Sequence, residues 1–140
     1  MGYQSIGAQI GVYPPPIGIN YNKGDVVDVS ALGAATNNGD VDGKIKVYAE
    51  YQKPGGQWTK MSDSPVKVLV KNGGSGSCNI TKQRTLDVVG TWKFHAVLEG
   101  YFPDTGWILL MASLDRTEDV VEPAPGGPVY ESLSVSVNVA

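Results

Sequence analysis

The feature that most constrains the fold is a period-two pattern at residues 44–51, KIKVYAEY. Because successive strand residues point to opposite faces of a sheet, this run predicts a half-buried antiparallel strand. Its buried face would carry Ile45, Val47, Ala49 and Tyr51. An apolar run precedes it at residues 26–32, and Asn38-Gly39 between the two runs tolerates the positive φ that a reversal needs. We therefore expect a pair of strands at 26–36 and 43–52 that turns at Asn38-Gly39.

The rest of the sequence repeats this theme, and no window has the spacing of an amphipathic helix. A chain of 140 residues forms about one domain and buries a core without disulfides or a metal. The 18 glycines and 9 prolines suit short strands with tight turns. A net charge of −3 disfavours nucleic acid as a partner. The longest apolar run, residues 107–112, is too short to enter and span a bilayer, so we expect no membrane insertion.

The N-terminal residues have neither the basic region nor the apolar core of a signal peptide. Either the chain is used without Sec export, as a virion protein would be, or it is the mature form of an exported protein. A lone cysteine, Cys78, excludes an internal disulfide and leaves the redox compartment open. The sequence thus favours a virion or an extracellular surface without separating the two.

About nine strands follow from the same pattern. The best core strand begins at Trp92 and would bury Trp92, Phe94, Ala96 and Leu98. Residues 107–111 are apolar on both faces, so they are covered on both sides or covered on one and exposed on the other. Residues 72–77 are expected to form a flexible loop, residues 116–128 an acidic loop, and residues 129–140 a strand with one valine face and one serine face.

Short strands at spacings of about 8–12 residues predict an all-β fold, an antiparallel β-sandwich of immunoglobulin-like type, with a jelly roll as the alternative. A single domain would span residues 17–140. Pro14-Pro15-Pro16 cannot pair in a central strand and sets residues 1–13 apart, either as an N-terminal arm or as a further strand of the sandwich.

Three turn motifs support a resemblance. Asn22-Lys23-Gly24-Asp25 precedes a valine-rich strand, Asn37-Asn38-Gly39-Asp40 precedes a strand containing Lys46-Val47-Tyr48, and Gly90-Thr91-Trp92 opens the late core strand. Over residues 20–115 this pattern resembles cell-adhesion-related bacterial and archaeal immunoglobulin-like domains, and similar sandwiches decorate phage capsids and tails. The resemblance implies a non-enzymatic surface or assembly module. The tandem arrangement and export signal usual in that family are absent here, which favours a self-contained structural protein.

One segment matches the opening of a calcium loop. Asn38, Asp40 and Asp42 occupy the first three ligand positions before Gly43. The twelfth position, where a bidentate glutamate is needed, would be Ala49. A plain turn rich in Asn, Gly and Asp explains the same residues, so both interpretations stay open, and no other cofactor is expected.

Catalytic chemistry has little support. His95 is the single histidine, and a surface imidazole explains it better than a metal ligand. Cys78 reads as a small, partly buried residue at a strand entry rather than a nucleophile. Nucleophile-elbow, phosphate-loop and zinc-protease motifs are missing, and Asp104 with Glu118 is the remaining carboxylate pair. We therefore assign no catalytic residue and expect a protein that is not an enzyme.

Aromatic residues gather in the segment 100–107, at a turn where sandwich domains often recognise partners. The candidate binding residues are Tyr101, Phe102, Asp104, Trp107 and Trp58. Flat aromatic surfaces bind protein or carbohydrate. In the alternative interpretation, Phe102 and Trp107 cap the end of the core.

Two function classes follow. The first is an assembly protein, either a virion component such as a capsid decoration or tail protein or a subunit of an extracellular filament, with itself or a neighbouring structural protein as partner. The second is a surface adhesion domain that binds carbohydrate or protein through aromatic residues. Residues 1–13 and 129–140 favour the first class, because these terminal segments carry one charge, Glu131, and would make unprotected sheet edges.

Overall fold

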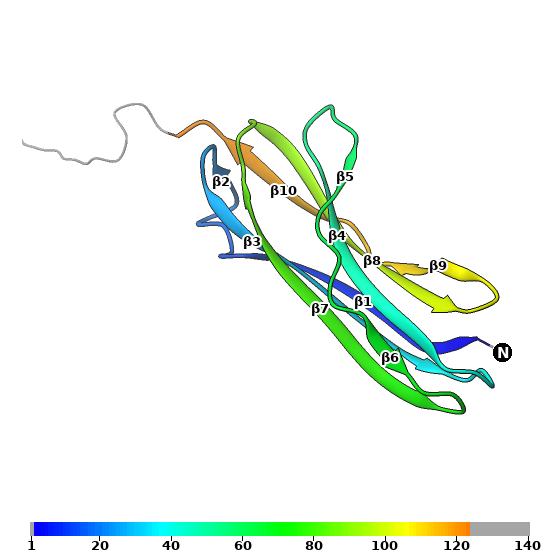
Figure 1. Cartoon of the computed structure of the whole chain (residues 1–140). Coiled ribbons are helices and arrows are strands. Elements are labelled where there is room, and N and C mark those ends of the chain that lie inside the picture. Colours follow the sequence, from blue (N-terminus) through cyan, green and yellow to red (C-terminus); the bar gives the residue numbers. More distant parts are fainter. Residues whose placement is uncertain (1, 124–140) are drawn as a thin grey trace, which may run out of the picture.

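The computed structural model describes residues 2–123, and the predicted strand at 129–140 lies outside them. Two sheets pack face to face with their strands roughly aligned (Figure 1). The chain is therefore an all-β sandwich, as the alternating pattern predicts. The described part contains no helix, and so none long and apolar enough to cross a membrane.

The smaller sheet, called here the small sheet, has three long strands in the order β1-β3-β7, all antiparallel. They are β1 (Tyr3–Tyr13), β3 (Val26–Asn37) and β7 (Gly74–Thr85). This sheet has two edges, β1 and β7. Residues 3–13 are therefore integrated into the sandwich of their own chain, which corrects the expectation of a separate N-terminal arm at 1–13.

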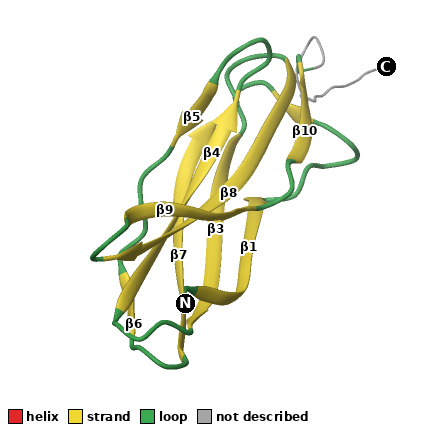
Figure 2. Ribbon diagram, turned by 90° about the vertical axis from the view of Figure 1, so that its right-hand side faces the viewer, coloured by secondary structure: helices red, strands yellow, loops and turns green. Residues whose placement is uncertain are grey.

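The other sheet, the large sheet, has seven strands in the order β2-β10-β8-β4-β5, with β6 also on β4 and β9 also on β8. Its members are β2 (Tyr21–Asn22), β4 (Gly43–Gln52), β5 (Trp58–Lys60), β6 (Lys67–Leu69), β8 (Gly90–Phe102), β9 (Gly106–Ala112) and β10 (Arg116–Val121). Figure 2 shows β4 and β8 at its centre and β9 crossing at an angle beside them. Among the described strands, only β2 and β10 pair in parallel.

The core lies between the sheets and contains the side chains that alternation predicts. Ile45, Val47, Ala49 and Tyr51 of β4 are buried, as are Trp92, Phe94, Ala96 and Leu98 of β8. The sheets approach closely at Gly33, where an added Cβ would lie 2.6 Å from Leu98 Cδ1. A larger residue at position 33 would therefore push the two layers apart.

The expected β3–β4 pairing is wrong. The chain does reverse after Asn37, but β3 belongs to the small sheet and β4 to the large sheet, so the segment 38–42 crosses between layers. Asn37 is fully buried, and its Nδ2 donates to the carbonyls of Val41 and Leu69, each at 2.9 Å. Its Oδ1 accepts from the amide of Gly39 at 2.8 Å. These bonds fix a crossover where a hairpin was expected.

Two predicted loops are also corrected. Residues 116–121 form β10 within the large sheet, because Val120 is buried and Arg116 Nε donates to Glu118 Oε2 at 2.6 Å, which pairs the charges. The glycine-rich segment 72–77 is mostly strand, since β7 begins at Gly74 and only a tight turn precedes it. The turns at 22–25 and 53–56 form as expected, with Gly24 and Gly55 at positive φ.

We expect Trp92→Ala to destabilise the fold by about 3–5 kcal/mol, because the side chain is fully buried and leaves a cavity. Its Nε1 also donates to the carbonyl of Val88 at 2.8 Å. Trp107→Ala, at a position 37% exposed, is the matched control and should cost about 1 kcal/mol or less. Urea denaturation measures both. Equal losses would contradict the assignment of Trp92 to the core.

Candidate interaction surfaces

Two of the predicted binding aromatics lie together where β8 and β9 meet. Tyr101 and Trp107 are cross-strand partners on the outer face of the large sheet, with ring centroids 5.4 Å apart. Lys44 Nζ lies 4.6 Å from the centroid of Tyr101, and Lys46 Nζ lies 4.4 Å from that of Trp107. Each ring thus has one face covered by an ammonium group, a favourable cation–π contact.

Phe102 is not part of this exposed pair. Its side chain is buried and stacks on Tyr3 with ring centroids 4.7 Å apart. The Tyr3 hydroxyl donates to the carbonyl of Tyr101 at 2.8 Å and so ties β1 to this end of β8. Phe102 therefore caps the core, which corrects its place among the binding residues, whereas Asp104 is exposed in the turn between β8 and β9.

Trp58 forms a separate site. Its strand partner Gln52 lies eight residues along β4 from Lys44, the partner of Tyr101, which corresponds to roughly 26 Å. The Trp58 ring stacks on His95 at 3.9 Å between centroids. The structure therefore places the predicted aromatics at opposite ends of one sheet face and does not join them into a single site.

The His95 ring has a partner at each nitrogen and on one face. Its Nε2 lies 2.7 Å from Glu50 Oε1, and its Nδ1 lies 3.1 Å from Asp115 Oδ1. Both ring nitrogens are thus engaged by carboxylates, and Trp58 covers one face of the ring. The imidazole is a structural link between β4, β5, β8 and the start of β10, and neither nitrogen is free to ligate a metal.

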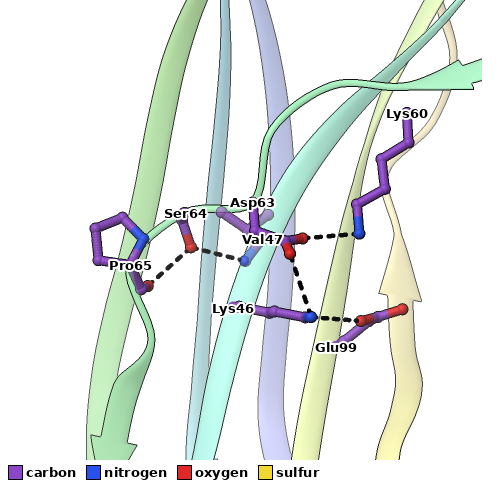
Figure 3. A network of polar contacts seen from close by, with 7 residues as sticks. All are labelled: Lys46, Val47, Lys60, Asp63, Ser64, Pro65 and Glu99. Carbon is purple, nitrogen blue, oxygen red and sulfur yellow. Dashed lines mark hydrogen bonds and ion pairs between the residues drawn. The ribbon is translucent and has the colours of Figure 1, made fainter.

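Between these two sites lies a network of charges that includes Lys46, Lys60, Asp63 and Glu99 (Figure 3). Lys60 and Lys46 approach Asp63 at 2.9 and 3.4 Å, and Lys46 also lies 3.7 Å from Glu99. Burial works to raise the pKa of Asp63, but the hydrogen bond from Lys60 and the charge of Lys46 outweigh it and hold that pKa below its usual value. On this face, the two lysines pair with the two carboxylates.

Tyr48 lies beside this network on the same outer face. Its side chain is buried under Lys60, whose Nζ lies 4.2 Å from the ring centroid. Burial raises the pKa of Tyr48 to about 12, and the negative charges of Glu99, Glu50 and Asp63 contribute to the rise.

The residues of the predicted calcium loop have other partners. Asp42 Oδ1 accepts from the amide of Lys71 at 3.0 Å, and the Asn38 side chain approaches Gln4 Oε1 at 3.4 Å. Asp40 is exposed. Across residues 2–123, His, Cys, Asp and Glu side chains nowhere gather in a group of three or more that could hold a metal.

The candidate catalytic groups are also separated. Glu118 lies opposite Trp92 at the start of β8, whereas Asp104 follows Phe102 at its end, so roughly 33 Å of strand separates them. Cys78 is buried on the inner face of β7, and burial raises the pKa of its thiol.

One surface was missed by sequence reasoning, namely the outer face of the small sheet. Its outward positions on β3 and β7 are Val26, Asp28, Ser30, Leu32, Ala34, Thr36, Ser75, Ser77, Asn79, Thr81, Gln83 and Thr85. On β1 the outward positions include Gly7, Gln9, Gly11 and Tyr13. Among these positions Asp28 is the one charged residue. The signal in the sequence is the alternation of small polar residues through 75–85. Residues 79–89 are predicted as a strand, but residues 72–77 are predicted as a loop, so the full length of the polar face is hidden.

The apolar segment 107–111 is largely uncovered. Leu110 packs against the core, whereas Trp107, Ile108, Leu109 and Met111 are 37%, 42%, 64% and 38% exposed. Ile108 and Leu109 are neighbours that point to opposite faces of the strand, so apolar area is exposed on both sides of the β8–β9 hairpin, more than either arrangement that the sequence leaves open.

Comparisons with known proteins identify no family. No protein-family model and no curated protein matches the sequence. Solved structures with similar folds include the X-ray structure of a Northeast Structural Genomics Consortium target, 10% identical, with a TM-score of 0.46 over 94% of this chain and 96% of that one. A protein from Archaeoglobus fulgidus is 8% identical, with a TM-score of 0.44 over 84% of this chain and 96% of that one.

We expect alkaline pH to destabilise the fold through Tyr48. The phenol of an unfolded chain ionises near pH 10, whereas folded Tyr48 keeps its proton to about pH 12. The folded state binds the extra proton between these values, so its stability falls as the pH rises from about 10 to about 12. Tyr48→Phe removes this contribution.

Urea denaturation at pH 8, 10 and 11.5 measures the effect as the difference between the two proteins. The native chain should lose stability relative to Tyr48→Phe across this range. Parallel pH profiles would show that the phenol is not held in its neutral form.

Proposed function

We propose that this chain is a non-enzymatic structural protein that acts by self-association, either as a virion component such as a capsid decoration or tail protein or as a subunit of an extracellular filament. The observation that carries the proposal is the outer face of the small sheet, which holds one charge, Asp28, over three long strands. Solvent-facing protein surfaces usually carry about 25–35% charged residues. Interface cores, by contrast, are depleted of Lys, Glu and Asp.

The polar groups of this face are already paired in ways that favour its burial. The hydroxyls of Ser30 and Thr81 bond across β3 and β7, and those of Thr36 and Ser75 do so at 2.6 Å. Such pairs keep a hydrogen bond when water is removed, so covering them costs less than covering unpaired hydroxyls. The short side chains also let a second flat surface approach closely.

The outer face of the large sheet is the internal comparison. It carries charged residues on β4, β5, β8 and β10, among them Lys46, Glu50, Lys60, Glu99 and Asp119. The charged outer face of the large sheet is suited to contact with water. The nearly uncharged outer face of the small sheet is suited to contact with another protein. The asymmetry supports an assembly role for the small sheet.

The order of the strands supports the immunoglobulin-like interpretation within this proposal. The neighbours β1-β3-β7 correspond to strands A, B and E of an immunoglobulin-like sandwich, and β4-β8-β10 correspond to C, F and G. A strand equivalent to D, which would extend the small sheet beyond β7, is not among the described residues. Domains of this type serve as surface and assembly modules, a fold-level analogy that agrees with the surface chemistry.

The exposed hairpin favours a second function, a surface domain that binds carbohydrate or protein. Trp107, Leu109 and the neighbouring Tyr101 offer aromatic and apolar area beside exposed Asp104. In this case Trp107→Ala would abolish binding of a soluble glycan or peptide in a fluorescence titration, while Trp58→Ala, at the far end of the same face, would leave it unchanged.

The proposal predicts that the chain self-associates in sedimentation velocity at micromolar concentration. Thr81→Lys places a charge midway along β7 on the outer face of the small sheet and should weaken association by about tenfold or more. Because Thr81 is exposed and loses only its hydrogen bond to Ser30, the free energy of unfolding should change by about 1 kcal/mol or less.

Thr91→Lys is the matched control. Thr91 is an exposed threonine of the large sheet opposite Asp119, so the new charge is compensated there and association should be unchanged. A chain that remains monomeric up to millimolar concentration would refute the proposed function.

A further inference from the structure

The β1 edge of the small sheet has no paired strand among the described residues, although Met111 of β9 lies beside Ala8. From Gly7 to Tyr13 this strand pairs in continuous register with β3 on one side, and no described strand pairs with its other side. Its free N–H and C=O groups therefore face outward as a template for another strand. Natural edges are usually blunted by charge, proline or a bulge, yet this stretch carries no charge or proline, and its bulge lies before Gly7.

The opposite edge, β7, is protected in the usual ways. It carries Lys82 and Arg84, and the side chain of Lys67 from β6 lies close against Gly76. Arg84 NH1 donates to the Tyr51 hydroxyl at 2.7 Å, which directs that charge toward the core end. Of the two edges, β1 is the one built to accept a strand.

The core is also incompletely covered along β1. Ile6, Ala8 and Ile10 pack against it but stay partly exposed, whereas Val12 at the end of the strand is fully buried. A shallow hollow of about 330 Å³ lies over β1 and β3 at this point, lined by Gly7, Ala8, Gln9, Leu32, Gly33 and Ala34, with Met111 of β9 at its side. An added strand with apolar inward residues would cover this flank.

Residues 129–140 have the composition that such a strand requires. One side of their alternation is Val129, Glu131, Leu133, Val135, Val137 and Val139, and the other is Tyr130, Ser132, Ser134, Ser136 and Asn138. The second series matches the outward residues of β7, which are Ser75, Ser77, Asn79, Thr81, Gln83 and Thr85. From Ser132 onward the sequence therefore has the two-faced pattern of a strand of the small sheet, with one apolar series and one small polar series, and Tyr130 and Glu131 before it depart from that pattern.

We infer that residues 129–140 of one copy add as a fourth strand to the β1 edge of a neighbouring copy. The inference rests on the proposed function and names the element that would join the copies. Donor and acceptor are different surfaces of the same chain, so the contact is head-to-tail and propagates into open chains or closes into rings.

The size of the outer face gives an independent reason for such a strand. Three strands spaced about 4.8 Å apart and about 40 Å long present roughly 550 Å², below the roughly 800 Å² per partner of a stable interface. The area of this face alone is therefore too small for a stable interface between two copies. Strand addition contributes main-chain hydrogen bonds and apolar burial that the face lacks.

The choice between a neighbouring copy and the same chain follows from the proposed function. β10 ends at Val121, at the end of the sandwich where the Tyr21 hydroxyl donates to the carbonyl of Pro14, which is also the end of β1. Residues 122–128 contain three prolines and Gly126-Gly127, so their sequence is compatible with a reversal onto the same β1 edge and with passage to a neighbour. Self-association selects the neighbour, and the 1–127 chain distinguishes the two.

The test begins with two full-length variants. Ser134→Pro/Val135→Pro removes the N–H groups of two adjacent residues, which point to opposite sides of a strand, so one needed bond is lost in any register. We expect association to weaken by about a hundredfold or more with the thermal midpoint of the sandwich unchanged. Ser134→Thr/Val135→Ile, the matched control, keeps the strand pattern and should assemble like the native chain.

A mixing experiment tests donor and acceptor separately. A chain of residues 1–127 keeps the described sandwich and lacks the donor, while Ala8→Lys points a charge inward at the acceptor edge and keeps the donor. Each should be monomeric alone, and an equimolar mixture should form a 1:1 dimer. A synthetic 129–140 peptide should also bind the 1–127 chain, and its Ser134→Pro/Val135→Pro form should not, which tests the acceptor even if Ala8→Lys fails to fold.

The failures are distinguishable. A native chain that assembles equally well with Ser134→Pro/Val135→Pro overturns this inference and leaves the proposed function standing. A monomeric native chain whose 1–127 form melts at lower temperature shows that the segment pairs within its own chain, and it overturns both.

Discussion

The buried amide of Asn37 determines how the chain passes between the two sheets. Three of its hydrogen bonds hold Val41, Leu69 and Gly39, and its own carbonyl accepts from Gly73 at 2.7 Å. Buried backbone groups need partners; the Asn37 side chain supplies them for the crossover and for Leu69, and its backbone carbonyl supplies one for the turn before β7. Replacing it with an apolar residue would leave several buried groups unpaired. The division of β3 and β4 between layers depends on this arrangement.

This constraint also explains which parts of the fold could be predicted from the sequence. The buried faces of β4 and β8 follow from period-two alternation, a local property that any sheet arrangement preserves. Sheet membership is not local. Asn38-Gly39 has the composition of a hairpin turn, and only the tertiary contacts of Asn37 with Leu69 direct the chain into the other layer. The strand at 116–121 was taken for a loop because the pairing of Arg116 with Glu118 cannot be seen in the sequence.

The same distinction between local sequence and tertiary contacts applies to the candidate interaction surfaces. Aromatic residues are easy to recognise in a sequence, but whether a ring can contact a partner depends on the residues packed against it. Phe102 is covered by Tyr3, and Lys46 lies over one face of Trp107. The outer face of the small sheet is hard to recognise because its signal is a lack of charge across three strands distant in the sequence. Its serines and glycines resemble those of loops until the pairing of β3 with β7 places them side by side.

The two outer faces differ in what they need from their surroundings. On the large sheet, Lys46 and Lys60 find Asp63 and Glu99, so that face is balanced in water and a partner would have to displace existing pairs. On the small sheet, the hydroxyls of Thr36 and Ser75 already bond to each other and the side chains are short, so a second protein surface would break few existing contacts. Association through the small sheet leaves the β8–β9 hairpin uncovered because Trp107 and Leu109 belong to the other layer. The two proposed contacts, between copies and with a further partner, therefore use different sheets.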